Sequence, residues 1–65
     1  MNINEEIKKC EENLKIFGVN YHQILANEHK LEGQDSNDAN FIGGILSVLY
    51  LIKSEAKKWK NQQKN

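Results

Sequence analysis

Residues 41–52 read FIGGILSVLYLI and decide the fold of this chain. Apolar side chains occupy every position from Val48 to Ile52, so they cover the whole circumference of a helix. A helix that is apolar on all sides is enclosed by neighbours, because a soluble monomer rarely leaves a large apolar patch in water. We therefore expect the rest of the chain to cover one side of this helix. A second copy of the chain, or an unrelated partner, would cover the other side.

A long helix is predicted around this stretch, over about residues 37–61. The run GQDSND at residues 33–38 concentrates turn-forming and capping residues, and Asp35 or Ser36 is the predicted N-cap. The sequence contains no proline that would end the helix early. The basic tail at about residues 60–65 is predicted to fray. We expect no membrane span, because the apolar run is shorter than the roughly 20 residues that cross a bilayer.

Two shorter helices are predicted before the long one. Apolar residues recur at alternating steps of four and three over residues 3–17, which predicts a helix with one apolar stripe. Gly18 follows, as is typical of a helix end in the left-handed conformation. Asn20 and Gln23 have the spacing of a capping box, so a second helix is predicted over about residues 20–32.

The predicted fold is all-α, a helical hairpin with a short N-terminal helix in one domain, residues 1–65. An alternative joins the first two helices into one bent helix over residues 3–31, because the apolar stripe continues in register past Gly18. A chain this short is marginally stable and needs a disulfide, a metal or a partner subunit. The single cysteine, Cys10, excludes an intrachain disulfide. Self-association into a homo-oligomeric helical bundle is therefore expected.

We predict no catalytic or metal-binding site and no cofactor. His22 and His29 lie about 10.5 Å apart along a helix, at 1.5 Å per residue, which is too far for one ion. Cys10 lies on the apolar stripe and is expected in the core rather than as a nucleophile. The chain is therefore expected not to be an enzyme. The start MNINEE does not have the pattern of a secretory signal, and with a reduced cysteine this predicts a cytoplasmic protein.

Small and weakly polar residues form a strip down one side of the long helix. Gly43 and Gly44 are each about 1 kcal/mol less favourable than alanine inside a helix, so another interaction must offset that cost. One interpretation is the close approach of another helix, and the alternative is a ligand at a subunit junction. The predicted ligand-binding residues are Asn40, Gly43, Gly44, Ser47 and Lys53. The predicted oligomer interface consists of Phe41, Ile45, Val48, Leu49 and Ile52.

Charge is distributed unevenly along the chain. Residues 1–52 hold four lysines and eight acidic residues, whereas residues 53–65 hold five lysines and one glutamate. Trp59 among these lysines can stack on a base while the ammonium groups hold phosphate, or can close the hairpin end against Ile3 or Ile7. The chain has no arginine, the side chain that usually reads guanine edges. An alternative function is therefore a small helical regulator that binds nucleic acid or a protein partner through its basic C-terminal helix.

Three features occur together: a short chain, an acidic-serine turn at Asp35 and Ser36, and a following helix of small and apolar residues from Asn40 to Ala56. In these features the chain resembles the short phage proteins that sequester cyclic nucleotide signals of bacterial antiphage defence. The resemblance implies a non-enzymatic homo-oligomer that holds a nucleotide between subunits, or blocks a defence factor, in the host cytoplasm. The expected partners are a second copy of the chain and a cyclic nucleotide or a host protein.

Overall fold

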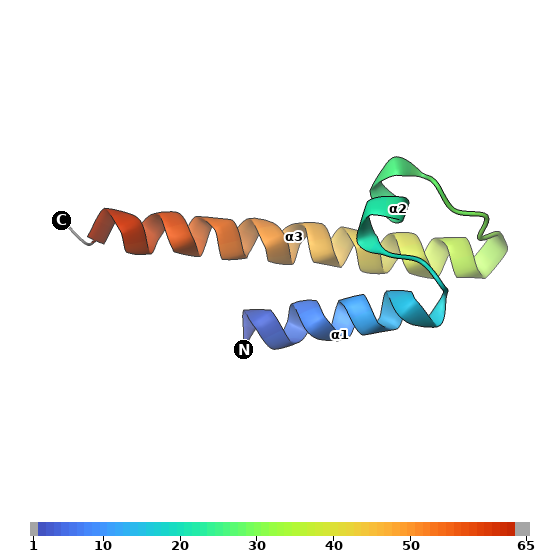
Figure 1. The fold of residues 1–65 in the computed structure, drawn as a ribbon, viewed down its shortest axis with the longest axis horizontal. Helices are drawn as coiled ribbons and strands as arrows, with labels where there is room; N and C mark the ends of the chain where they lie inside the picture. The colour runs from blue at the N-terminus through green and yellow to red at the C-terminus, as the bar shows by residue number, and fades with distance from the viewer. Residues whose placement is uncertain (1, 64–65) are drawn as a thin grey trace.

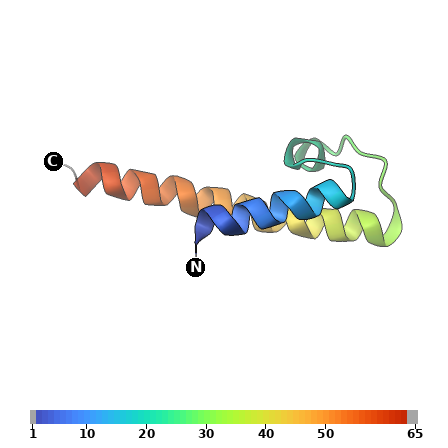
Figure 2. The same ribbon diagram turned by 60° about the horizontal axis from the view of Figure 1, so that its bottom comes forward.

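The computed structural model describes the backbone of residues 2–63 and the side chains of residues 2–59. Within this range it has three helices and no strand: α1 (Ile3–Ile16), α2 (Tyr21–Ala26) and α3 (Gly33–Gln63). α1 runs antiparallel beside α3, and the short α2 packs on a neighbouring flank of α3, so that all three helices share one core (Figures 1 and 2). The prediction of an all-α, hairpin-like fold is confirmed.

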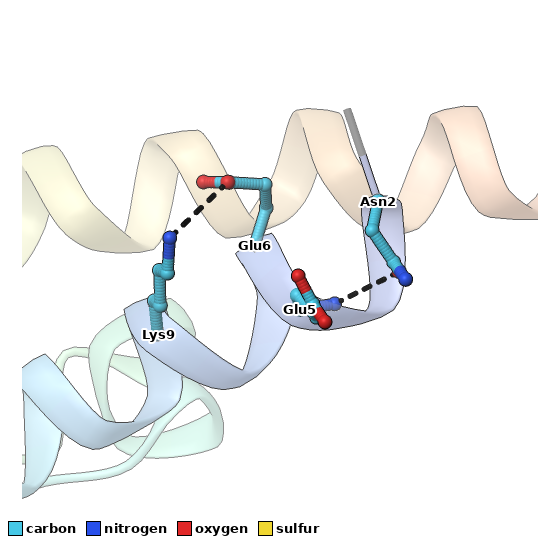
Figure 3. Close-up of polar contacts among 4 residues, drawn as sticks. All are labelled: Asn2, Glu5, Glu6 and Lys9. Atoms are coloured by element: carbon cyan, nitrogen blue, oxygen red, sulfur yellow. Dashed lines mark hydrogen bonds and ion pairs between the residues drawn. The ribbon is translucent and has the colours of Figure 1, made fainter.

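α1 begins where the apolar stripe begins. The side chain of Asn2 accepts a hydrogen bond from the backbone N–H of Glu5 at 3.2 Å and so caps the helix (Figure 3). Glu5 and Glu6 lie in the first turn, at the positive end of the helix dipole. Lys9 forms an ion pair with Glu6 at 3.7 Å. These exposed contacts support the helix start, while the opposite side of α1 packs on α3.

Gly18 separates α1 from α2. Its φ of +75° lies in the left-handed region, where glycine has no steric penalty, and α1 ends at Ile16. Asn20 and Gln23 form the predicted capping box, in which each side chain accepts a backbone N–H at 2.9 Å. α2 is therefore a separate helix, and the alternative of one bent helix over residues 3–31 is wrong.

α2 is shorter than the predicted helix over residues 20–32. It ends at Ala26, where Asn27 takes the left-handed conformation with a φ of 55°. Asparagine tolerates this conformation better than most residues, so the chain leaves the helix there. Residues 28–32 are not helical and lead to the start of α3 (Figure 1). The prediction located the start of this helix and overestimated its length.

α3 begins earlier than predicted, so that Asp35 and Ser36 lie inside its first turns and neither is the N-cap. Two hydrogen bonds between side chains four residues apart support these turns. Gln34 donates to Asp38 at 2.7 Å, and Asn40 donates to Ser36 at 3.4 Å. Asp35 also suits the positive end of the helix dipole. These contacts explain why residues typical of turns continue the helix.

α3 extends past the start of α1 and continues to Gln63 (Figure 1). Trp59 lies near the C-terminal end of α3 and is 61% exposed. The prediction that Trp59 closes the hairpin end is therefore wrong, because Trp59 lies about 200° around the helix from Lys57, which lies beside the start of α1. The predicted fraying of residues 60–65 stays a prediction, and residues 64 and 65 lie outside the described residues.

One side of α3 forms the core with the other two helices and the loop after α1. Leu46 and Ala39 of α3 are fully buried, and Leu14 of α1 is 1% exposed. Cys10 packs against this core, as predicted. The buried apolar residues are Ile7, Leu14, Val19, Ile24, Ala39, Leu46 and Leu49. The core thus uses only one of the two apolar sides of α3.

Candidate functional site

The other side of α3 carries a row of large, exposed apolar side chains. Phe41 is 71% exposed and Val48 is 56% exposed. Phe41, Ile45, Val48 and Ile52 follow steps of four and three, which is the spacing of a coiled-coil seam. We call this row the open face, and its members are Phe41, Ile45, Val48, Leu51, Ile52 and Trp59. Extended apolar patches of this kind on soluble proteins usually mark interaction sites.

The predicted interface residues lie on both sides of α3. Phe41, Ile45, Val48 and Ile52 lie on the open face. Leu49 is 7% exposed and belongs to the core of its own chain, because it lies about 100° around the helix from Val48. Leu51 and Trp59 were not predicted as interface residues and extend the open face. The four-three spacing indicates a row of interface residues. Because the run from Val48 to Ile52 is apolar on all sides of the helix, the sequence does not show which side α1 and α2 cover.

The predicted ligand-binding strip is also divided. Gly43 is buried, and a Cβ at this position would lie 2.6 Å from Cγ2 of Ile24. Gly44 is exposed, and a Cβ there would meet no atom within 4 Å. The close-approach interpretation is therefore confirmed for Gly43, where α2 crosses α3. Asn40 and Ser47 lie on the same flank of α3 as Gly43, and Lys53 lies farther along the helix.

Ser47 links α2 to α3. Its Oγ donates to the carbonyl of Gly43 at 3.1 Å, and the hydroxyl of Tyr21 lies 2.6 Å from the same Oγ. Since the Ser47 hydroxyl has one proton and gives it to Gly43, the Tyr21 hydroxyl donates to Ser47. The Tyr21 ring also meets the ring of Tyr50 edge-on, at 5.0 Å between centroids. No spacing in the sequence indicates this network, which joins positions far apart in the chain.

Tyr50 links α3 to α1, because its hydroxyl donates to Oε2 of Glu11 at 3.2 Å. Burial, this hydrogen bond and the charge of Glu11 raise the pKa of Tyr50. Burial also raises the pKa of Cys10, with smaller contributions from Glu6 and Glu11. A thiol with a raised pKa is mostly protonated and weakly nucleophilic. Tyr50 therefore joins α3 to α1, and the thiol of Cys10 packs against the core.

A shallow hollow of about 270 Å³ lies where the start of α1 meets α3. Lys53, one of the predicted ligand residues, lines it together with Lys57. The remaining lining residues are Ile3, Asn4 and Ala56. Lys53 and Lys57 bring two ammonium groups to this hollow. It is a second surface feature that sequence reasoning found only through Lys53.

The two histidines have different surroundings. His22 is exposed, whereas His29 is half-buried in the loop before α3. Nδ1 of His29 accepts the backbone N–H of Leu31 at 3.2 Å, and its buried Nε2 has no partner among the described residues. In the part of the chain that the structure describes, no three His, Cys, Asp or Glu side chains are grouped to hold a metal ion.

No protein-family model, curated protein or solved structure matches this chain. Across residues 2–63, none of the helices combines the length and the apolar character required to cross a membrane. Within residues 2–59, exposed apolar side chains gather on the open face of α3, and two lysines line the hollow at the start of α1.

Proposed function

We propose that this chain is a non-enzymatic binding protein that acts as a homo-oligomeric helical bundle. The open face of α3 is the observation that carries the proposal. Burial of apolar surface stabilises an assembly by about 25 cal/mol per Å². Aromatic side chains such as Phe41 and Trp59 bury roughly 150–250 Å² each when they are fully covered. A second copy that covers the open face therefore supplies the stabilisation that a short chain needs.

The proposed ligand is a nucleotide second messenger bound at the lysine-lined hollow. Lys53 and Lys57 offer two positive charges, and the N-terminus of α1 adds the favourable end of a helix dipole for a phosphate. The resemblance to phage proteins that sequester such signals supports the same ligand class. In this proposal the protein removes the signal, or blocks a defence factor, by binding alone. The proposed location is the host cytoplasm, where a thiol such as Cys10 stays reduced.

Sedimentation equilibrium of the unmodified chain over a wide dilution range tests the assembly. We expect a mass larger than that of one chain, which falls towards one chain as the protein is diluted, because association follows mass action. A mass of one chain at every concentration would contradict the homo-oligomer.

Thermal unfolding with cyclic di- and trinucleotides tests the ligand. A ligand present at 100 times its Kd should stabilise the folded protein by about 2.7 kcal/mol. Replacing Lys53 and Lys57 together by alanine should remove this stabilisation. Lys30→Ala, at an exposed position in the loop before α3, is the matched control. The absence of any thermal shift would exclude the nucleotide and leave the proposed assembly in place.

The projecting end of α3 supports a second candidate, a regulator that binds nucleic acid or a protein partner. Lys57, Lys58 and Trp59 are exposed near the C-terminal end of α3. Lysines beside an aromatic ring can hold a single strand, and such binding weakens steeply as salt rises. Deletion of residues 60–65 together with replacement of Lys57, Lys58 and Trp59 by alanine should abolish this binding, and full retention of affinity would count against it.

A further inference from the structure

α3 is divided by charge along its length. Residues 33–52 contain Asp35 and Asp38 and no lysine, so their net charge is −2. Residues 53–63 contain four lysines and Glu55, so their net charge is +3. The open face crosses the boundary between these two parts. Lys53 and Lys57 lie beside the start of α1, whereas Glu55 lies within the open face itself.

The open face also has the regular spacing that a matching helix requires. Phe41, Ile45, Val48 and Ile52 continue through Glu55 to Trp59 in steps of four and three. Glu55 is the one charged member of this series, and its carboxylate lies 3.6 Å from the ammonium group of Lys58. Gly44 lies at the edge of the row with open space above it, which lets a second helix approach closely.

We propose that the open face binds the open face of a second copy, with the two α3 helices antiparallel. In this orientation Glu55 of each chain lies beside an apolar position of the other chain, away from the second Glu55, and the acidic start of each α3 points towards the basic end of the other. A parallel pair in register would instead place the two Glu55 carboxylates against each other, where like charges repel. The inference rests on the self-association proposed above and adds the relative orientation of the two α3 helices.

One antiparallel register covers the whole open face. If Val48 lies against Ile52 of the second copy, Phe41 lies against Trp59, and Ile45 lies against Glu55. Leu51 then lies next to its own counterpart at the two-fold axis. The contact covers residues 41–59, about 27 Å of helix at 1.5 Å per residue. The interface is isologous and therefore closes on itself, so it yields a dimer rather than a fibre.

Disulfide trapping tests the orientation. One variant carries Ile45→Cys and another carries Glu55→Cys, both in a Cys10→Ser background that removes the native thiol. In the antiparallel register, position 45 faces position 55, whereas two copies of either position lie about 15 Å apart along the axis. A disulfide requires Cα atoms within about 7 Å. We expect a disulfide between the two variants when they are mixed, and none in either variant alone.

The controls distinguish specific pairing from collision and from misfolding. Positions 45 and 55 are exposed, so both variants should keep the helical circular dichroism of the unmodified chain. Ile16→Cys lies on α1, is 80% exposed and is outside the open face. Mixed with Glu55→Cys under the same oxidation, it should form no disulfide above the background of random collisions.

The other outcomes would overturn the inference in distinguishable ways. A disulfide in either variant alone would mean a parallel pair and would leave self-association intact. A dimer that forms no disulfide in any mixture would place the interface elsewhere on the chain. A chain that is monomeric at every concentration would remove both this inference and the proposed homo-oligomer, and would assign the open face to a different protein.

Discussion

The two sides of α3 carry similar side chains and differ in what covers them. Leu46 is completely buried, whereas Val48, two positions later, is 56% exposed. Both are aliphatic, so hydrophobicity alone does not separate them. The positions of α1 and α2 distinguish Leu46 from Val48, because both helices pack on the side of α3 that contains Leu46. One apolar side therefore stabilises the single chain, and the other is free for association. Substitutions on the two sides should affect different equilibria.

The largest difference is expected between Leu46→Ala and Val48→Ala. Loss of a fully buried leucine side chain should lower the free energy of unfolding by about 2–5 kcal/mol. Val48→Ala should change the unfolding of the dissociated chain by less than about 0.5 kcal/mol, because the side chain is largely in water. Urea unfolding at a concentration where the chain is monomeric measures both. Equal losses would mean that the two sides are not distinct in solution.

Gly43 and Gly44 provide a second test of the difference between the two sides of α3. A Cβ at position 43 would overlap Ile24, and such overpacking costs about 1–3 kcal/mol. The better helix propensity of alanine offsets about 1 kcal/mol, so Gly43→Ala should destabilise the monomer by up to about 2 kcal/mol. Gly44→Ala meets open space and should stabilise the monomer by up to about 1 kcal/mol. Urea unfolding of the two variants should therefore give shifts of opposite sign, and shifts of the same sign would contradict the assignment of sides.

Much of the fold could be predicted from local signals. The apolar stripe located α1, and the capping box of Asn20 and Gln23 located the start of α2. Element lengths were harder to predict. The left-handed Asn27 ended α2 early, and contacts between side chains four residues apart extended α3 through a run of turn-forming residues. Both outcomes depend on a balance of small local energies that residue type alone does not resolve.

The candidate site was less predictable because it depends on how helices pack. The sequence shows that α3 is apolar all round, and only the placement of α1 and α2 separates Leu49 in the core from Leu51 on the open face. The same placement buries Gly43 and leaves Gly44 exposed. The contacts from Tyr21 to Ser47 and from Tyr50 to Glu11 join distant parts of the chain, and no local spacing in the sequence predicts them.

The smallest expected effect is a pH dependence of the free energy of unfolding, which arises from Tyr50 on the covered side of α3. Burial and Glu11 raise the pKa of Tyr50, so the phenol ionises at lower pH in the unfolded chain than in the folded chain. Its contribution to stability is therefore present below about pH 10 and is lost as the pH rises through the folded-state value. In Tyr50→Phe, the fall in the free energy of unfolding above about pH 10 should be shallower. Val48→Phe is the control on the open face and should keep the original slope. Identical slopes in all three proteins would contradict the role given to Tyr50.

The fluorescence of Trp59 tests most directly whether a second copy covers the open face. This residue is the only tryptophan in the chain and is 61% exposed when the chain is alone. We expect blue-shifted emission at high concentration that moves to the red on dilution, as the ring passes from an apolar contact into water. Val48→Glu should emit in the red at every concentration, while Ser54→Glu, an exposed position off the open face, should behave like the unmodified protein. Red emission from the unmodified protein that does not change with concentration would contradict the account.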